Sequence, residues 1–423
     1  MYLLRHAKAQ RYSTTLIFQT LIMAELAQTL NHFQPSAISE IFTLANQLKN
    51  EGQDILDLSI GEPDFPTPDH IRQAGISAIN DNQTKYTNVE GTLALRQAIS
   101  RKFKHENGLD YHPQQIVVDA GAKPLLIHAM QAMLNDGDEV IIPTPCWTSY
   151  VGMVALCNAS CTFVPCPQDK GFKLQPQDLQ AAITSKTKLI LINSPSNPTG
   201  AAYSHAEMKE ITDVLLRHPD IWVLSDDIYE HITYDDFKFV TAAQVEPQLY
   251  DRTLTLNGVS KAYSMTGWRI GYAAGPQDLI DGIKKILSQS TGSPCSISQA
   301  AAIEALQGPQ AFLSERVEIF RERRNYLNKR LNTIEGIECH QPEGAFYLYP
   351  SCEKLIGKTT PQGLIIQNSN DFASYLLTSQ GVAVVPGEAF KYDPNFRLSY
   401  ATSMETLTRA ADRIEAACHA LSD

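Results

Sequence analysis

The segment Lys188-Leu-Ile-Leu-Ile-Asn-Ser-Pro-Ser-Asn-Pro-Thr-Gly200 decides the fold class of this chain. Its first five residues predict a strand that is buried on both faces, because a strand with one wet face would alternate apolar and polar residues. The turn after it contains Pro and Gly and ends the strand. A helix is expected over residues 207–217 and another apolar strand over residues 221–225. A strand, a helix-length segment and a second strand in this order predict a parallel βαβ unit.

The same alternation continues on both sides of this unit, from about residue 115 to residue 275. Helices are expected between the strands, among them residues 123–135 and 176–184. The further apolar runs are residues 116–119, 139–143, 161–165, 253–256 and 269–273. Together these runs predict an α/β fold whose mostly parallel, seven-stranded sheet is covered by helices on both faces.

Beyond residue 275 the pattern changes to helices with short strands between them. A long charged helix is expected over residues 315–331, and a last helix closes the chain. The short strands are expected at residues 345–349, 382–386 and 396–400. Helices and strands in this arrangement predict a second, smaller α+β domain.

The composition excludes several classes of protein. The chain has 423 residues, 43% of them hydrophobic, which suits a large buried core and excludes global disorder. Its 35 Lys and Arg against 46 Asp and Glu give a net charge of −11, with no basic run to bind a nucleic acid. No stretch reaches the roughly 18 consecutive apolar residues of a membrane helix. We therefore expect a soluble, cytoplasmic protein without a nucleic-acid or membrane partner.

The first 24 residues differ from the rest of the chain. They contain no acidic residue but carry Arg5, Lys8 and Arg11. The lack of an Ala-x-Ala cleavage pattern behind an apolar core favours an extra upstream start, with Met23 as the functional beginning, over a transit or signal peptide. We interpret residues 1–24 as an N-terminal extension outside the fold.

Eight cysteines are scattered along the chain without a CxxC pair. Cys157, Cys161 and Cys166 lie close together in the sequence, but no histidine accompanies them at the spacing of a zinc site. We interpret the cysteines as buried, reduced small residues and expect no metal site.

The segment Ser260-Lys-Ala-Tyr-Ser-Met-Thr-Gly-Trp-Arg-Ile-Gly-Tyr272 indicates chemistry. Lys261 follows an apolar strand and a turn, and a lysine in apolar surroundings loses its proton more easily because burial disfavours the ammonium. The neutral amine is the form that makes a Schiff base with an aldehyde. The alternative is an exposed loop in which Lys261 and Arg269 have no such role.

Three further segments place polar groups where strands end. Asp226 stands at the carboxyl end of a predicted strand, where open α/β sheets bind ligands, although it could instead be a solvated cap. Asn197 lies in the turn after residues 188–192, and turn chemistry alone could explain it. Asp119-Ala-Gly-Ala-Lys-Pro124 joins a strand to a helix start, so its backbone N–H groups could hold a phosphate with the help of the helix dipole.

Nine motifs occur in one order along the chain: Gly61-Glu-Pro-Asp-Phe65, Lys85-Tyr86, Gly121-Ala-Lys123, Trp147, Asn197-Pro-Thr-Gly200, Ser225-Asp-Asp-Ile-Tyr229, Ser260-Lys-Ala-Tyr263, Gly267-Trp-Arg269 and Arg397-Leu-Ser-Tyr-Ala401. In this order they resemble the class I aminotransferases among the fold-type I pyridoxal-phosphate (PLP) enzymes, and within them the bacterial aspartate aminotransferase subgroup. The resemblance runs from about residue 33 to the C-terminus. It implies a large PLP-binding domain over residues 70–309, and a small domain built from residues 25–69 together with residues 310–423.

The resemblance implies a role for each residue around the cofactor. Lys261 would hold PLP through a Schiff base and then move the α-proton of the substrate. Asp226 would pair with the pyridine N–H, while Tyr229 and Asn197 would hydrogen-bond the 3-oxygen of the ring. Trp147 would stack on the ring, although an aromatic residue there could equally belong to the core.

A second group of residues is implied to hold the phosphate of PLP. They are Arg269 and the backbone N–H groups near Ala122 and Lys123, while Gly121 and Ser260 are implied to bind the cofactor as well. Tyr86 would reach the phosphate from the neighbouring subunit, which implies a homodimer with shared active sites.

The resemblance also implies how an amino acid binds. Arg397 would hold the α-carboxylate in a bidentate ion pair, and Gly61 would let the backbone approach the substrate. Trp147 and Asn197 would contact it as well. Lys123 occupies the position at which subgroup members that accept dicarboxylic substrates carry a lysine for the distal carboxylate. This favours aspartate or glutamate with 2-oxoglutarate or oxaloacetate as the acceptor, unless Lys123 only adds positive potential near the phosphate.

Several alternatives stay open from the sequence. Gln34 and Cys146 depart from residues found in many relatives, which leaves prephenate and aromatic 2-oxo acids open as substrates. The same scaffold also hosts alanine aminotransferases and β-lyases. A PLP-binding transcription regulator would need a DNA-binding domain ahead of the match. A nicotinamide-dependent dehydrogenase would need a GxGxxG motif between a strand and a helix, which this sequence does not contain.

Overall fold

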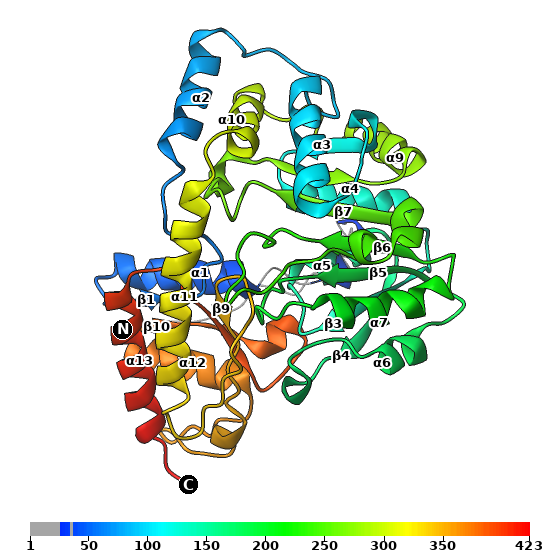
Figure 1. The fold of residues 1–423 in the computed structure, drawn as a ribbon. Coiled ribbons are helices and arrows are strands. Elements are labelled where there is room, and N and C mark those ends of the chain that lie inside the picture. Colours follow the sequence, from blue (N-terminus) through cyan, green and yellow to red (C-terminus); the bar gives the residue numbers. More distant parts are fainter. Residues whose placement is uncertain (1–25, 34–36) are drawn as a thin grey trace, which may run out of the picture.

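The computed structural model describes residues 26–33 and 37–423, and a mixed seven-stranded sheet lies at its centre (Figure 1). In order across the sheet the strands are β2 (Ile116–Asp119), β8 (Gly271–Ala274), β7 (Thr253–Gly258), β6 (Trp222–Asp226), β5 (Thr187–Asn193), β3 (Glu139–Thr144) and β4 (Ser160–Pro165). β8 runs antiparallel to both of its neighbours, and the other pairs are parallel. The predicted α/β fold with a mostly parallel seven-stranded sheet is therefore confirmed. The extension over residues 1–24 and Gln34 lie outside the described residues.

β5 shows why an unbroken apolar run forms a strand at this place. Leu189 and Leu191 pack on one face of the sheet, while Ile190 and Ile192 pack on the other. Burying each such side chain stabilises the fold by about 1.5–3 kcal/mol. Because all four side chains are buried away from water, a polar residue at any of these positions would be buried without a hydrogen-bond partner.

Helices cover both faces of the sheet. One face packs against α4 (Ala122–Met133), α5 (Ser149–Leu156) and α9 (Gln277–Leu287). The opposite face packs against α6 (Pro176–Ala182), α7 (His205–Leu216) and α8 (Ala242–Val245) over β3 to β6, and against α2 (Asp69–Asn80), α3 (Leu93–Asn107) and α10 (Ser296–Gln307) over β2 and β8. With both faces covered, the carboxyl ends of the strands are the places where polar side chains can meet a ligand.

Local sequence sets the ends of several of these helices. Ser204 and Glu207 form a capping box at the start of α7, in which each side chain accepts the backbone N–H of the other residue. The side chain of Thr92 caps α3. The same helix ends at Gly108, whose φ of 67° is the left-handed conformation that glycine adopts without strain.

The predicted elements are largely present, and two of the strands need correction. The helices expected over residues 123–135, 176–184 and 207–217 are α4, α6 and α7, with ends displaced by at most two residues. The strand expected from residue 269 begins only at Gly271, because Arg269 has a φ of 58°, which a strand does not allow. The strand expected over residues 382–386 is divided into β10 (Val382–Ala383) and β11 (Val385–Pro386), which belong to different sheets.

The remaining elements gather around another hydrophobic core. β1 (Leu56–Asp57) pairs in parallel with β10, so segments from near both ends of the chain share a sheet. A second small sheet is antiparallel and contains β11, β12 (Phe396–Ser399) and β9 (Tyr347–Leu348). Their helices are α1 (Ala37–Asn50), α11 (Ala311–Leu331), α12 (Ser369–Gln380) and α13 (Met404–His419), drawn in blue and in yellow to red in Figure 1. The division of the chain into domains near residues 69 and 310 stays a prediction.

Short 3₁₀ helices connect the larger elements. They are η1 (Gln28–His32), η2 (Pro113–Gln115), η3 (Gln168–Lys170), η4 (Pro247–Arg252), η5 (Thr266–Trp268), η6 (Glu353–Leu355) and η7 (Gly387–Phe390). Within the described part of the chain, no helix is both long enough and apolar enough to cross a membrane. The cytoplasmic location stays a prediction from the sequence.

The cysteines are free thiols, but the prediction that they are all buried is wrong for three of them. Cys157 and Cys161 are partly buried, and Cys295 is exposed. Cys295 lies directly before α10, at a helix start on the surface. The buried cysteines are Cys146, Cys166, Cys339, Cys352 and Cys418.

Candidate active site

A cavity of about 450 Å³ opens at the carboxyl ends of the central strands. The register of β5 and β6 places their last residues, Asn193 and Asp226, side by side, and Lys261 follows β7. The predicted site residues that line the cavity are Gly61, Ala122, Lys123, Trp147, Asn197, Asp226, Tyr229, Ser260, Lys261, Arg269 and Arg397. The fold thus brings together residues that lie in widely separated segments of the chain.

The amine of Lys261 faces into this cavity. Its Nζ donates a hydrogen bond to the carbonyl oxygen of Gly61 at 2.6 Å. The pKa of Lys261 is lowered to about 8, mainly by burial; the charges of Arg397 and Arg269 add to this effect, whereas the carboxylate of Glu62 acts against it. Near neutral pH a useful fraction of this lysine is therefore the neutral amine, which is the nucleophilic form.

Asp226 lines the cavity, and its carboxylate accepts a hydrogen bond from a tyrosine. The hydroxyl of Tyr150, on α5, donates to Asp226 Oδ2 at 2.6 Å, and the backbone N–H of Ile228 donates to Oδ1 at 3.4 Å. Burial raises the pKa of Asp226 to about 6, against the lowering effect of the Tyr150 hydrogen bond. A buried carboxylate in this state is suited to a cationic N–H partner, which would restore its charge.

Two glycines make room for a positively charged cradle at the start of α4. Gly121 has a φ of 107°, and a Cβ on it would lie 2.4 Å from Arg269 Nη2. A Cβ on Gly271 would lie 2.3 Å from the backbone nitrogen of Ala122. Burial, and then the charge of Arg269, lower the pKa of Lys123, whose Nζ lies 4.9 Å from the ring centre of Trp147. Backbone N–H groups in the first turn of a helix, together with a guanidinium, are typical ligands of a phosphate.

Arg397 also lines the cavity, and its guanidinium lies against two aromatic rings. It is 4.6 Å from the ring centre of Tyr347 and 5.2 Å from that of Phe390. Its Nη1 donates to Asn197 Oδ1 at 2.8 Å, and its Nη2 donates to the carbonyl oxygen of Ser59. The buried Nε has no hydrogen-bond partner among the described residues. The guanidinium offers a positive charge to a carboxylate in the cavity, and Arg forms bidentate pairs with carboxylates.

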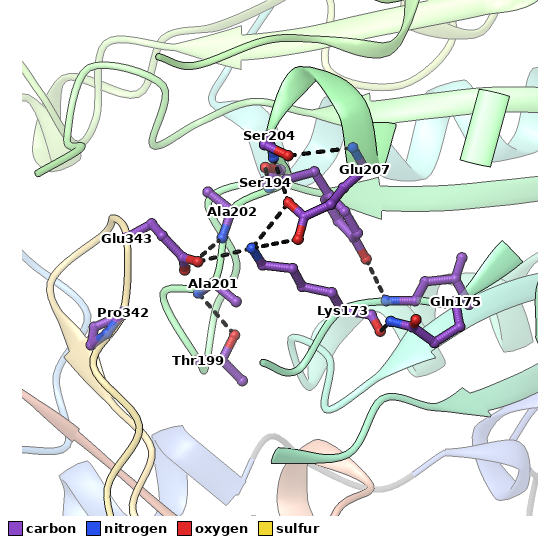
Figure 2. A network of polar contacts seen from close by, with 12 residues as sticks. Lys173, Gln175, Ser194, Thr199, Ala201, Ala202, Ser204, Glu207, Pro342 and Glu343 are labelled. Atoms are coloured by element: carbon purple, nitrogen blue, oxygen red, sulfur yellow. Dashed lines mark hydrogen bonds and ion pairs between the residues drawn. The ribbon is translucent and has the colours of Figure 1, made fainter. Parts of the chain in front are cut away.

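The loop that carries Asn197 is held by the network of charges shown in Figure 2. Lys173 Nζ lies 3.0 Å from Glu207 Oε1, on α7, and 2.9 Å from Glu343 Oε1, just before β9. Glu343 also accepts the backbone N–H of Ala202 at 3.2 Å. The loop is thus tied both to the helix that follows it and to the segment that leads into β9.

Two predicted residues lie apart from the cavity lining. Gly121 does not line the cavity but packs directly against the guanidinium of Arg269. Tyr86 lies outside the cavity and is fully exposed on the surface of this single chain. Its contribution to a neighbouring subunit stays a prediction.

Among the lining residues that were not predicted from the sequence are three with polar side chains, namely Glu62, Tyr150 and Tyr347. Glu62 stands within the quoted motif Gly61-Glu-Pro-Asp-Phe65, so its position was available as a signal. Tyr150 lies three residues after Trp147, close enough to suggest a common surface. Tyr347 had no local signal, because its partners are distant in the sequence.

A possible metal-ligand cluster lies outside the cavity. One ligand atom each of Glu106, Glu230 and His231 lie within 4.8 Å of one another. The buried ammonium of Lys102 forms ion pairs with both carboxylates, at 3.5 Å from Glu106. The positive charge that this cluster needs is thus supplied by a lysine of the chain.

Comparisons with known proteins agree with this geometry. Residues 53–414 match the family described as aminotransferase class I and II. A protein of Rhizobium leguminosarum bv. phaseoli named probable aspartate/prephenate aminotransferase is 56% identical over 94% of this chain and 100% of its own length. An aspartate/prephenate aminotransferase of Cereibacter sphaeroides is 53% identical over 95% of this chain and 100% of its own.

Solved structures show the same relationship in three dimensions. The crystal structure of the aspartate aminotransferase from Rhizobium meliloti has a TM-score of 0.92 and 51% identity, covering 95% of this chain and 100% of that one. The aspartate aminotransferase from Thermus thermophilus with maleate has a TM-score of 0.87 and 37% identity, covering 93% of this chain and 100% of that one. The fold, the arrangement of the cavity and these similarities together show that the chain belongs to the class I and II aminotransferases.

Proposed function

We propose that this aminotransferase uses PLP and moves the amino group of an acidic L-amino acid, aspartate or glutamate, to a 2-oxo acid such as 2-oxoglutarate or oxaloacetate. The observation that carries the proposal is the juxtaposition in one cavity of a lysine with a lowered pKa, a buried carboxylate and two separate arginines. An aldehyde, a ring nitrogen, a phosphate and a substrate carboxylate each find a suitable partner there.

The residues present fit PLP in three respects. Lys261 offers an amine to the aldehyde, and Arg269 together with the backbone N–H groups at the start of α4 offers donors to the phosphate. Asp226 offers a carboxylate to the pyridine nitrogen. When bound, PLP supplies an electron sink that makes the α-proton of the amino acid acidic.

The residues of the chain would share the remaining work. Arg397 would hold the α-carboxylate through its guanidinium, which lies against the rings of Tyr347 and Phe390. Lys261 Nζ would then take the proton from the α-carbon and deliver it again, a role that a pKa near 8 suits at neutral pH. Tyr229 and Asn197 would donate hydrogen bonds to the 3-oxygen of the ring.

The choice of an acidic substrate rests on a second cationic group. Lys123 lies in the cavity lining together with Arg397, so an amino acid with two carboxylates meets two positive charges. The Thermus thermophilus relative was solved with maleate, itself a dicarboxylate. The relatives from Rhizobium leguminosarum and Cereibacter sphaeroides are named as aspartate/prephenate aminotransferases, the former as a probable one, which favours prephenate as a second acceptor. Aromatic or alanine transamination and β-elimination are the other outcomes to be tested.

We also propose that the enzyme is a homodimer with shared active sites. Tyr86 is fully exposed in the single chain, and Ile76, Ile79 and Leu93 are exposed apolar residues on the neighbouring α2 and α3. Contact with a partner over α2 and α3 would remove these apolar side chains from water. A second copy of the chain is the partner that would bring Tyr86 to a phosphate.

The Lys261→Ala variant tests the reaction. Wild-type protein incubated with PLP is expected to acquire a visible absorption band. It is also expected to convert aspartate and 2-oxoglutarate into oxaloacetate and glutamate. The variant is expected to lose transamination while its thermal unfolding midpoint stays near that of the wild type. Full turnover by the variant would contradict the proposal, and pyruvate with ammonia as products would indicate a β-lyase.

The Lys123→Ala variant tests the substrate class. Loss of a hydrogen bond to a charged group is expected to lower kcat/KM for aspartate and glutamate by about tenfold or more. Alanine, which has no distal carboxylate, should be much less affected. Measurement with 2-oxoglutarate, oxaloacetate, phenylpyruvate and prephenate as acceptors completes the panel, and equal losses for all donors would assign Lys123 to the phosphate instead.

A further inference from the structure

We propose that Tyr347 is a positioning residue that makes Tyr229 donate its hydroxyl proton toward the cofactor. The inference rests on the proposed function, because it concerns how Tyr229 would meet the 3-oxygen of PLP. It assigns a role to a residue for which the sequence offered no motif.

Tyr347 contacts residues on both sides of the cavity. It is fully buried in β9, and its hydroxyl oxygen lies 2.7 Å from that of Tyr229. Its ring lies against the guanidinium of Arg397. A Cβ on Gly61 would lie 2.5 Å from the hydroxyl oxygen of Tyr347, so the glycine lets the phenol occupy this place.

The direction of the hydrogen bond between the two phenols depends on what else is present. Each hydroxyl has one proton and can accept as well as donate, so either tyrosine of the pair can be the donor. Burial raises the pKa of both phenols, which therefore keep their protons at neutral pH. Once Tyr229 donates its proton to an anionic ligand oxygen, only Tyr347 can donate within the pair.

The resulting chain runs in one direction, from Tyr347 to Tyr229 to the ligand oxygen. Hydrogen bonds in a chain polarise one another, so a donation received by Tyr229 strengthens the donation that it makes. A stronger donor stabilises the deprotonated 3-oxygen of the ring. It thereby lowers the pH at which the visible absorption of the bound cofactor changes.

The hydroxyl and the ring of Tyr347 can be tested separately. Tyr347→Phe removes the hydroxyl but keeps the aromatic ring against Arg397, so binding of the substrate carboxylate should change little. Tyr375→Phe is the matched control, because Tyr375 on α12 is also buried and donates its hydroxyl to a backbone carbonyl, that of Ala417, at 3.1 Å. Tyr375 does not line the cavity.

The experiment is a pH titration of the visible absorption of PLP-loaded wild type, Tyr347→Phe, Tyr229→Phe and the double variant. The midpoint of Tyr347→Phe is expected to rise by about half a pH unit or more, as the loss of one hydrogen bond would produce. In the Tyr229→Phe background the same substitution should add nothing, because Tyr347 acts through Tyr229. The dissociation constant of PLP, titrated into cofactor-free protein, should rise in Tyr347→Phe and not in Tyr375→Phe.

The outcomes separate this inference from the proposed function. If wild type and Tyr347→Phe have the same pH midpoint, the inference is overturned and the proposed function stands. The same holds if Tyr347→Phe shifts the midpoint as much in the Tyr229→Phe background as it does in the wild type. A wild-type protein that acquires no visible band with PLP overturns the proposed function, and the inference with it. Similar thermal unfolding midpoints for Tyr347→Phe and Tyr375→Phe show that any shift arises at the site.

Discussion

At the scale of single residues, the charges around Lys261 act in opposite directions. Burial, Arg397 and Arg269 lower the pKa of its amine, while Glu62 and Asp226 raise it. Glu62 has the largest effect among these charges, and its side chain is held by a hydrogen bond from the Thr266 hydroxyl. The net pKa of about 8 is therefore a balance that one carboxylate can change.

Glu62→Gln is expected to lower the pKa of Lys261 below that of the wild type. The neutral amine attacks the aldehyde, so the rate of PLP uptake by cofactor-free protein should rise with pH through the pKa of Lys261 and then level off. In the variant this midpoint should lie at lower pH, because a positive charge loses its neighbouring negative one. Stopped-flow absorbance across a pH series measures it. The glutamine oxygen can still accept from Thr266, and an unchanged or higher midpoint would contradict the expectation.

Asp227 carries a different pH effect, on stability. Burial raises the pKa of Asp227 to about 8, and only its Oδ1 is hydrogen-bonded, by Ser225 Oγ at 2.7 Å. Between the unfolded pKa near 4 and the folded value, the folded chain binds a proton that the unfolded chain has lost. The stability that Asp227 contributes therefore falls as the pH rises through this range.

Asp227→Asn should remove this dependence, because an amide stays neutral and keeps the acceptor for Ser225. From about pH 5 to about pH 7, the free energy of unfolding of the wild type should fall by about 1.4 kcal/mol per pH unit relative to the variant. Urea unfolding at several pH values measures the difference. Parallel curves for the two proteins would mean that Asp227 is ionised in the folded chain.

At the scale of elements, the loop between β5 and α7 depends on partners outside itself. The ion pairs with Glu343 and Glu207 outweigh the effect of burial and raise the pKa of Lys173, so it stays charged. This one ammonium links α7 to the segment before β9, as Figure 2 shows. Asn197 in the loop accepts a hydrogen bond from Arg397, so a shift of the loop would also affect the arginine proposed to bind the substrate.

Lys173→Met should loosen this loop without touching the cavity. Two carboxylates would lose their common cation, and KM for the amino acid is expected to rise about fivefold, the equivalent of about 1 kcal/mol, with a smaller change in kcat. Lys209→Met is the control, because Lys209 lies on α7 and forms ion pairs with Asp213 and Glu246. Steady-state kinetics of both variants tests this expectation. Equal KM values for the amino acid in Lys173→Met and Lys209→Met would mean that the loop does not affect substrate binding.

At the scale of the whole molecule, the proposed homodimer places part of each site on a second chain. The Tyr86 hydroxyl would donate to the phosphate of the neighbouring subunit, and nothing within one chain brings it to the cavity. The acidic net charge does not oppose anionic substrates, because Lys123, Arg269 and Arg397 concentrate positive charge inside the cavity.

Tyr86→Phe should weaken PLP binding while the protein stays dimeric. Loss of a hydrogen bond to a charged phosphate is expected to raise the dissociation constant of PLP by about tenfold. Light scattering should give twice the mass of the chain for the wild type and the variant, and Tyr326→Phe on α11 serves as the control. A monomeric wild type with full PLP affinity would refute the shared site.

The sequence by itself determined the sheet and identified several of the residues that line the cavity. The apolar run of β5 is readable because burial on both faces leaves no room for polar residues. Lys261, Asp226 and Arg269 were identified because each stands in a local motif beside a strand end or a turn. Periodicity and turn chemistry act over a few residues, and a sequence displays such information directly.

Only the tertiary structure decided which distant side chains meet in the cavity. Tyr150 reaches Asp226 and Tyr347 reaches Tyr229, and these partners are 76 and 118 residues apart in the chain. The left-handed backbone conformation of Arg269 likewise differs from the strand that its own segment predicted. Such contacts follow from the packing of β9 and α5 against the ends of the central strands, and no periodicity within a segment encodes packing between segments.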